Sequence, residues 1–292
     1  FPVKDKKSAQ YDDHQCSSYD VEACSWSNIP DEDFALADDH HWTIGQFVWT
    51  GFDYLGEPSP YDTDAWPNHS SMFGIIDLAS LPKDRYYLYR SVWNKDAETL
   101  HILPHWTWPG REGEVTPVFV YTNYPTAELF INGKSYGKQS KNNSSLKNRY
   151  RLMWMDAVYE PGEAYNKDGK AVAEKVVRTA GKPHHIELVS NRNELTADGK
   201  DLAYVTVKVV DKDGNLCPTD NRQINFSAKG TGKYRAAANG DPTNLEQFHL
   251  PKMHAFNGML TAIIQAGETA GEIVFTAKAN GVKAGNIRIQ TK

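Results

Sequence analysis

Residues 46–58 read QFVWTGFDYLGEP, and this stretch decides how the first third of the chain is interpreted. It begins as an apolar run rich in aromatic residues, which is typical of a buried strand. It ends as a polar loop that Gly51 and Gly56 interrupt and Pro58 closes. A strand that runs into such a loop can place an aromatic wall and carboxylates at the mouth of a pocket. We therefore expect a binding site here.

The overall composition is that of an ordinary globular protein. Of the 292 residues, 40% are hydrophobic and 24% are charged. The formal net charge of −5 argues against a nucleic-acid partner, because phosphate contacts require a basic surface. No apolar run approaches the roughly 20 residues that a membrane-spanning helix needs.

The three cysteines fit neither a disulfide framework nor a zinc site. We expect Cys16, Cys24 and Cys217 to be free or buried thiols, with a bridge between Cys16 and Cys24 as the alternative. The chain shows no ligand spacing for a metal, and we expect neither a metal nor a cofactor.

From residue 97 onward the pattern changes to short alternating runs separated by turns. About seven short strands over residues 97–180 predict an immunoglobulin-like β-sandwich, and Asn132-Gly133 is its strongest hairpin signal. A second run of strands over residues 181–292 predicts a second sandwich of this kind, and neither sandwich needs a helix. Its expected strands cover residues 185–189, 203–210, 223–227, 260–265, 273–277 and 285–290.

Residues 1–96 contain too few elements to bury a core. We expect one strand at the start of the 46–58 stretch, a short helix that begins at Pro30 and a longer helix over residues 82–93. A strand, a long polar loop and a helix in this order are typical of the last βα unit of a (β/α)₈ barrel that begins before Phe1. The predicted fold is therefore mainly β, with two sandwiches preceded by part of a barrel.

Seven segments together resemble the C-terminal part of glycoside hydrolase family 2 β-galactosidases of the Bacteroidetes type. The first three resemble the end of the catalytic barrel, the next two the sandwich that follows it, and the last two the terminal invasin-like immunoglobulin domain. The segments are GQFVWTGFDYLGEP (45–58), SSMFGIID (70–77), PKD (82–84), LPHWTWPGREG (103–113), ELFINGKS (128–135), LTADGKD (195–201) and VKVVDKDGN (207–215).

The resemblance implies a retaining exo-β-glycosidase that removes terminal β-galactosides from oligo- or polysaccharides in the periplasm or outside the cell. Such an enzyme needs two carboxylates roughly 5 Å apart. In the family both are glutamates on earlier barrel strands, so we expect no catalytic residue in this chain and no activity from the chain alone. The expected partners are the substrate and the remainder of the barrel.

The resemblance also assigns substrate-binding residues. Trp49 matches the tryptophan at the end of the eighth barrel strand, which forms a wall of the sugar subsite, with barrel core as the alternative. Asp53 matches an acidic residue that binds a sugar hydroxyl or orients a neighbour, and Tyr54 is a candidate rim aromatic. Glu57 matches no catalyst of the family, and its alternative role is to stabilise the loop.

The segment after this loop bears on the sugar. Residues 71–74 read SMFG, where β-glucuronidases of the family carry Asn-x-Lys-Gly, whose lysine and asparagine pair with the sugar carboxylate. The missing lysine favours a neutral sugar. Tyr61 and Trp66 are further candidates for the rim.

The alternative function is a non-catalytic carbohydrate-binding or adhesion module built from the tandem sandwiches. The eight Trp and fifteen Tyr residues suit sugar contacts and core packing equally. Residues 46–58 discriminate between the two functions, because an adhesion module has no reason to carry a barrel strand that bears Trp49.

Overall fold

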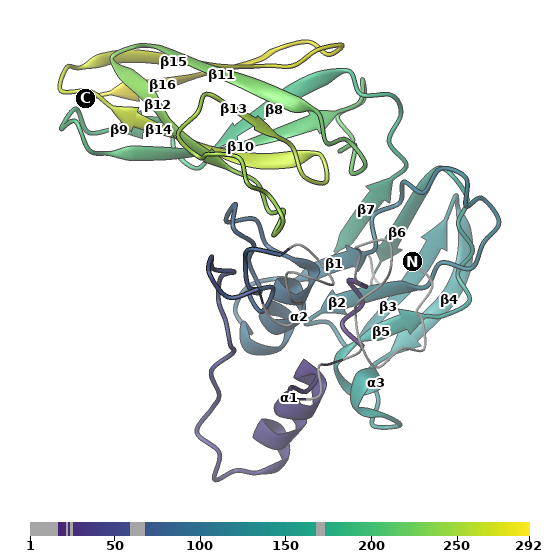
Figure 1. Cartoon of the computed structure of the whole chain (residues 1–292). Coiled ribbons are helices and arrows are strands. Elements are labelled where there is room, and N and C mark those ends of the chain that lie inside the picture. Colours follow the sequence, from purple (N-terminus) through teal and green to yellow (C-terminus); the bar gives the residue numbers. More distant parts are fainter. Residues whose placement is uncertain (1–16, 22, 24–25, 59–67, 168–172) are drawn as a thin grey trace. The chain divides into compact units, whose positions relative to one another are not determined.

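The computed structural model describes residues 17–21, 23, 26–58, 68–167 and 173–292 (Figure 1). The protein is mainly β and divides into two compact units. The first unit comprises Phe1–Ile76 and Pro82–Thr179, and the second comprises Asp77–Leu81 and Ala180–Lys292. No helix within the described ranges is both long and apolar enough to cross a membrane.

The first unit contains a sandwich of two antiparallel sheets. One sheet has the order β1-β2-β5 and the other has the order β4-β3-β6-β7. Their strands are β1 (Leu100–Leu103), β2 (Val118–Thr122), β3 (Thr126–Ile131), β4 (Lys134–Ser140), β5 (Leu152–Trp154), β6 (Glu163–Lys167) and β7 (Glu174–Arg178). The predicted hairpin is confirmed, because Asn132 and Gly133 join β3 to β4 with φ of 48° and 81°.

Among its described residues, the first unit has the helices α1 (Pro30–Asp39), α2 (Asp84–Trp93) and α3 (Leu146–Tyr150). The helices expected at Pro30 and after Pro82 are confirmed. Helix α3 was not expected, and it begins where the Ser145 hydroxyl accepts a hydrogen bond from the Asn148 amide at 3.1 Å.

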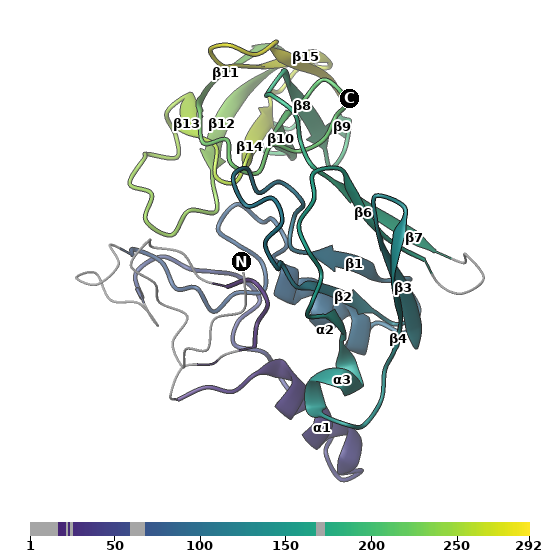
Figure 2. The same cartoon turned by 90° about the vertical axis from the view of Figure 1, so that its right-hand side faces the viewer.

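The sheet β1-β2-β5 is covered on both faces, so every residue of β2 is buried. Val118, Val120 and Trp154 point into the sandwich core. Phe119 and Tyr121 point the other way, into a second cluster with residues of α1 and α2. Figure 2 shows α2 beside β1 and β2. The helices of the first third therefore do not need a core of their own, because they share one with this sheet.

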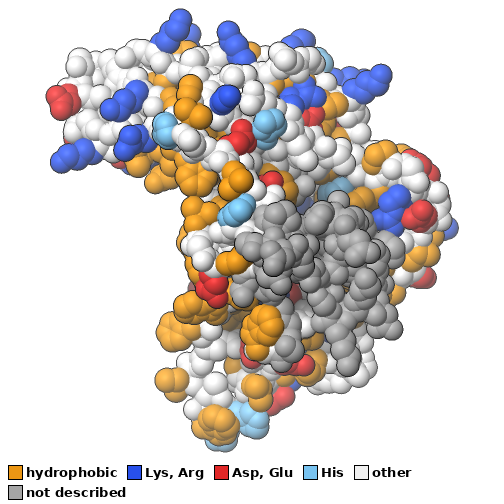
Figure 3. Space-filling view, in the orientation of Figure 1, with side chains coloured by type: hydrophobic (Ala, Val, Ile, Leu, Met, Phe, Trp, Pro, Cys, Tyr) orange, Lys and Arg blue, Asp and Glu red, His pale blue; other side chains and the backbone are white. Residues whose placement is uncertain are grey.

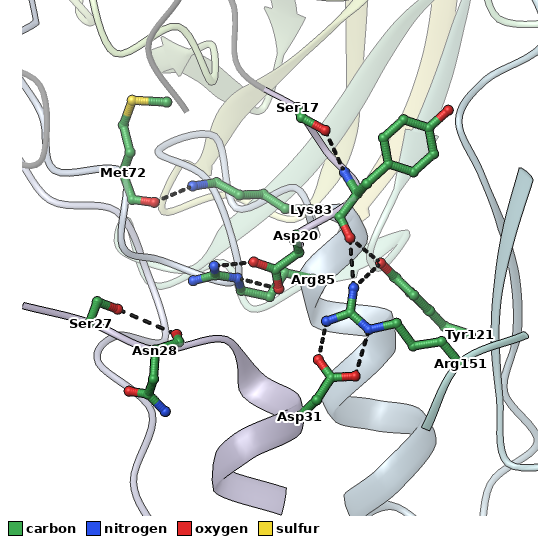
Figure 4. A network of polar contacts seen from close by, with 11 residues as sticks. Ser17, Asp20, Ser27, Asn28, Asp31, Met72, Lys83, Arg85, Tyr121 and Arg151 are labelled. Atoms are coloured by element: carbon green, nitrogen blue, oxygen red, sulfur yellow. Dashed lines mark hydrogen bonds and ion pairs between the residues drawn. The ribbon is translucent and has the colours of Figure 1, made fainter. Parts of the chain in front are cut away.

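A buried ion pair joins α1 to the sandwich (Figure 4). Arg151 and Asp31 form a bidentate pair, and both side chains have zero exposure. Arg151 also donates to the Tyr19 carbonyl at 2.7 Å. Burial disfavours the charge on Arg151, but Tyr121 and Asp31 stabilise it, and the net effect is a raised pKa. Arg151 therefore remains charged in the folded protein.

The strand expected at the start of the 46–58 stretch is not formed. Residues 44–48 have no secondary structure, and the side chains of Ile44 and Phe47 are fully exposed. A strand requires a neighbour to accept and donate its backbone hydrogen bonds, and none of the described residues provides one for this segment. The expectation of a strand is wrong for this structure, and the barrel unit stays a prediction.

The second unit is also a sandwich, with sheet orders β12-β14-β10-β8 and β13-β11-β15-β16-β9. All six expected strands are present, and β9, β12 and β13 were missed. The strands are β8 (His185–Ser190), β9 (Glu194–Leu195), β10 (Leu202–Val210), β11 (Gln223–Gly230), β12 (Gly232–Ala238), β13 (Lys252–His254), β14 (Met259–Ala266), β15 (Gly271–Lys278) and β16 (Gly285–Thr291).

The structure shows the state of one of the three cysteines. Cys217 is a free thiol buried in the core of the second sandwich, as expected, and burial raises its pKa to about 11. Cys16 and Cys24 lie outside the described residues.

The second unit includes a short segment from the first third of the chain, Asp77–Leu81. The Asp77 carboxylate accepts hydrogen bonds from the backbone amides of Ala79 and Leu81 at 2.8 and 2.9 Å, which fixes a turn. The Ala79 carbonyl accepts a hydrogen bond from the Thr261 hydroxyl of β14 at 2.6 Å. A Cβ atom on Gly240 would lie 2.0 Å from an Asp77 carboxylate oxygen, so a larger residue at this position would displace the carboxylate that fixes the turn.

The buried pair predicts a large loss of stability in the Arg151→Ala variant, because Asp31 would remain as an uncompensated buried charge. We expect the free energy of unfolding of the first unit to fall by about 3–5 kcal/mol. All eight tryptophans of the chain lie in the first unit, so urea unfolding followed by tryptophan fluorescence reports this unit.

The matched control is Arg149→Ala, which removes partly exposed pairs with Asp38 and Asp39. This variant is expected to lose less than about 1 kcal/mol. Equal losses of unfolding free energy in the two variants would show that the buried pair stabilises the first unit no more than the surface pairs do.

Candidate functional site

The loop that contains the candidate residues is held by backbone hydrogen bonds between residues 50–56 and residues 69–76. Ile76 donates to the Gly51 carbonyl at 3.0 Å, and Asp53 donates to the Ile76 carbonyl at 2.9 Å. Further along, the Ser71 amide donates to the Tyr54 carbonyl at 2.8 Å, and the Gly56 amide donates to the His69 carbonyl at 3.0 Å. The two segments therefore fix the backbone from which the candidate side chains project.

Three of the four candidates lie together on the exposed side of this loop. The Trp49 indole, 72% exposed, donates to the Tyr54 hydroxyl at 3.3 Å. The two rings meet edge to face with centroids 6.4 Å apart. The Tyr54 hydroxyl in turn donates to the Glu57 carboxylate, and this hydrogen bond raises the pKa of Tyr54. Trp49, Tyr54 and Glu57 thus form a continuous hydrogen-bonded row, and the peptide bond between Trp49 and Thr50 is cis.

The fourth candidate, Asp53, lies apart from this row because its carboxylate is buried. It accepts a hydrogen bond from the Gly74 amide at 2.8 Å and pairs with the Lys83 ammonium at 2.7 Å. Burial raises the pKa of Asp53, and Lys83 opposes this effect. Lys83 also donates to the Met72 carbonyl at 3.3 Å. Asp53 therefore connects the two segments of the loop to the start of α2.

The sequence interpretation missed the partners of Asp53. A Cβ atom on Gly74 would lie 2.2 Å from the Asp53 nitrogen, so no other residue fits this position without a shift of the backbone. Lys83 lies 30 residues from Asp53 in the chain. The PKD segment at 82–84 was a motif of the resemblance, but only the structure shows that its lysine pairs with Asp53.

Apolar side chains are unusually exposed on the approach to this loop. Figure 3 shows hydrophobic side chains along one edge of the first unit. Isolated exposed apolar residues are normal, but a dense set of large ones marks a binding surface. Those more than half exposed between residues 36 and 55 are Leu36, Trp42, Ile44, Phe47, Trp49, Phe52 and Leu55.

The arrangement can bind a ligand through an exposed indole and a phenol–carboxylate pair. In the part of the chain that the structure describes, no group of three or more His, Cys, Asp or Glu side chains could hold a metal ion. Of the two carboxylates in residues 49–57, one is committed to Lys83 and the other to Tyr54. The rim candidates Tyr61 and Trp66 lie outside the described residues.

Comparison with known families gives two matches. Residues 186–288 match the model described as glycoside hydrolase family 2 C-terminal domain 5. Residues 113–175 match a domain of unknown function, DUF4982.

Among curated proteins, the chain is similar over its whole length to the β-galactosidase BoGH2A of Bacteroides ovatus, with 41% identity over 296 residues. It is 36% identical over 210 residues, or 70% of the chain, to a putative β-glucuronidase of Formosa agariphila. The chain spans about a third of the first protein (34%) and a fifth of the second (20%).

Among solved structures, a β-glycosidase from Bacteroides vulgatus is 31% identical, with a TM-score of 0.85. The match covers 95% of this chain and 34% of that one. A glycosyl hydrolase family 2 member from Bacteroides cellulosilyticus is 30% identical, with a TM-score of 0.78, and covers 87% of this chain and 37% of that one.

The Asp53–Lys83 pair predicts a pH-dependent loss of stability in the Lys83→Met variant. Without the cation, the pKa of the buried Asp53 rises further above its unfolded value, so the folded state binds a proton that the unfolded state does not. Stability then falls as pH rises. We expect a loss of about 1–3 kcal/mol at pH 7.5 and a smaller loss at pH 5.5, measured by urea unfolding with tryptophan fluorescence.

Lys138→Met on the exposed strand β4 is the control, and its effect is expected to be small at both pH values. A loss in Lys83→Met that does not change with pH would contradict the assigned role of the pair.

Proposed function

The chain belongs to glycoside hydrolase family 2, and on that premise we propose that it is the C-terminal portion of a retaining exo-β-glycosidase, specifically a β-galactosidase that releases terminal β-galactosyl residues. The observation that carries this proposal is the 41% identity with the β-galactosidase BoGH2A along the entire chain. The corresponding cellular location is the periplasm or the extracellular space.

In this proposal, the row of Trp49, Tyr54 and Glu57 forms one wall of the sugar subsite. The exposed indole packs against the apolar face of the sugar, and the Tyr54–Glu57 pair is within reach of its hydroxyls. Asp53 acts indirectly, because its bonds to Gly74 and Lys83 fix the loop from which the row projects. The role of Asp53 is thus to orient its neighbours.

A neutral sugar fits this wall better than a uronic acid. The relatives include proteins named β-galactosidase and proteins named β-glucuronidase. The lysine that contacts this loop, Lys83, is paired with Asp53, so it does not offer a free cation to a sugar carboxylate. Residues 71–74, SMFG, supply no other cation.

The two catalytic carboxylates belong, in this proposal, to the rest of a (β/α)₈ barrel that this chain completes. The exposed residues Ile44 and Phe47 support this assignment. Burial of each side chain against neighbouring strands would stabilise the protein by about 1.5–3 kcal/mol. The strand that is absent from the structure would form against the same neighbours.

The assay uses 4-nitrophenyl β-galactoside and 4-nitrophenyl β-glucuronide with this chain alone and with the protein extended upstream. We expect no turnover by the chain alone and turnover of the galactoside by the extended protein. In the extended protein, Trp49→Ala is expected to lower kcat/KM at least tenfold, while Trp26→Ala, which removes a similarly exposed tryptophan, leaves it unchanged.

Preference for the glucuronide would overturn the choice of sugar. Turnover by the chain alone would overturn the placement of the catalytic carboxylates. Inactivity of both forms would favour the non-catalytic carbohydrate-binding module.

A further inference from the structure

The second unit contains a hollow where the connection between β12 and β13, residues 239–251, meets the end of β13. Its volume is about 390 Å³, which lies within the range of small-molecule sites. A connection of this length without helix or strand is uncommon in a compact sandwich and is usually functional. The lining residues that matter below are Asp241, Asn244, Leu245, Glu246, His254 and Phe256.

The connection is fixed by hydrogen bonds of its own side chains. The side-chain amide of Asn239 donates a hydrogen bond to the His254 carbonyl at 2.9 Å and accepts one from the Asn244 side chain at 3.1 Å. Asp241 accepts from the Thr243 amide at 2.8 Å. The Glu246 carboxylate accepts a hydrogen bond from the backbone amide of His254 at 2.9 Å. Its other oxygen lies 3.0 Å from Nδ1 of the His254 imidazole. The hollow is therefore shaped before a ligand arrives, which lowers the entropic cost of binding.

The groups that line the hollow have hydrogen-bonding positions left for a polar ligand. Each carboxylate has about four acceptor positions, so Asp241 and Glu246 can accept more hydrogen bonds than the connection itself uses. The side chain of His254 is half exposed, and Glu246 occupies only its Nδ1. Hydroxyl groups of a ligand could donate to the carboxylates and bond to the imidazole Nε2.

Apolar groups lie beside these polar ones. Leu245 is 77% exposed, and Phe256 lines the same hollow. A sugar ring presents hydroxyls at its edge and C–H groups on its faces, so it matches both kinds of lining. The two acidic side chains disfavour an acidic sugar, because like charges at close range repel.

From this combination we propose that the hollow in the second sandwich binds a neutral carbohydrate. This site is built entirely from residues of the second unit, so it is separate from the row of Trp49, Tyr54 and Glu57. Its function would be to hold a polysaccharide without cleaving it.

The test is affinity electrophoresis of the 292-residue chain in native gels that contain a soluble neutral galactan, xyloglucan or galactomannan, with polygalacturonate as the acidic probe. At least one neutral polymer is expected to retard the chain. Leu245→Ala and His254→Ala are each expected to weaken this binding at least fivefold. The Leu245 side chain is largely exposed and that of His254 half exposed, and thermal unfolding checks that the variants remain folded.

His249→Ala is the matched control, because His249 is an exposed histidine of the same connection that does not line the hollow. It should bind like the unaltered chain. Three outcomes would overturn the proposal: no retardation by any neutral polymer, retention of full affinity by both hollow variants, or preference for polygalacturonate. None of these depends on whether the extended protein hydrolyses galactosides, so this proposal and the proposed function can fail separately.

Discussion

The ion pair between Arg151 and Asp31 is the interaction on which the first unit depends. Both charges are withdrawn completely from water, and such a withdrawal is tolerable only when each charge is paired and its remaining hydrogen bonds are satisfied. For Arg151, the Tyr19 carbonyl and the Tyr121 hydroxyl accept these further hydrogen bonds. Since Asp31 is in the first turn of α1 and Arg151 immediately precedes β5, the pair specifies where the N-terminal helix packs on the sandwich.

This arrangement explains how a segment without a core of its own becomes ordered. The sheet β1-β2-β5 offers two apolar faces, and the sandwich uses only one of them. Leu88 and Tyr89 of α2 and Phe34 of α1 cover the other. The loop that carries Trp49 leads, through residues 69–76 and Lys83, into α2, so its position depends on the same packed face.

Most of the elements could be predicted because their signals are local. Alternation revealed β10 and β14, and Pro30 marked the start of α1. Strand β12 was missed because Lys, Arg and three alanines give little strand signal, and its place depends on pairing with β14. The apolar run before Trp49 predicted a strand that is not formed, because an apolar pattern indicates burial but cannot supply the neighbour that a strand requires.

The candidate site shows the same limit. The sequence identified the loop and its four polar or aromatic residues, but it could not distinguish the buried Asp53 from the exposed Glu57. That difference arises from Lys83 and Gly74, which are distant in the chain and are brought to Asp53 by the pairing of residues 50–56 with residues 69–76. Whether a carboxylate is buried, and which residue it pairs with, depends on the folded backbone. The spacing of residues along the sequence does not predict either property.

The turn at Asp77–Leu81 has a consequence for how this architecture can evolve. The turn belongs to the second unit although it lies between two segments of the first, so the second unit is not one continuous piece of sequence. A recombination event that exchanged everything after Thr179 would bring in a sandwich without the threonine and glycine that match Ala79 and Asp77. The terminal sandwich is therefore not a freely interchangeable module, and its replacement requires matched changes in the chain immediately after the loop that carries Asp53.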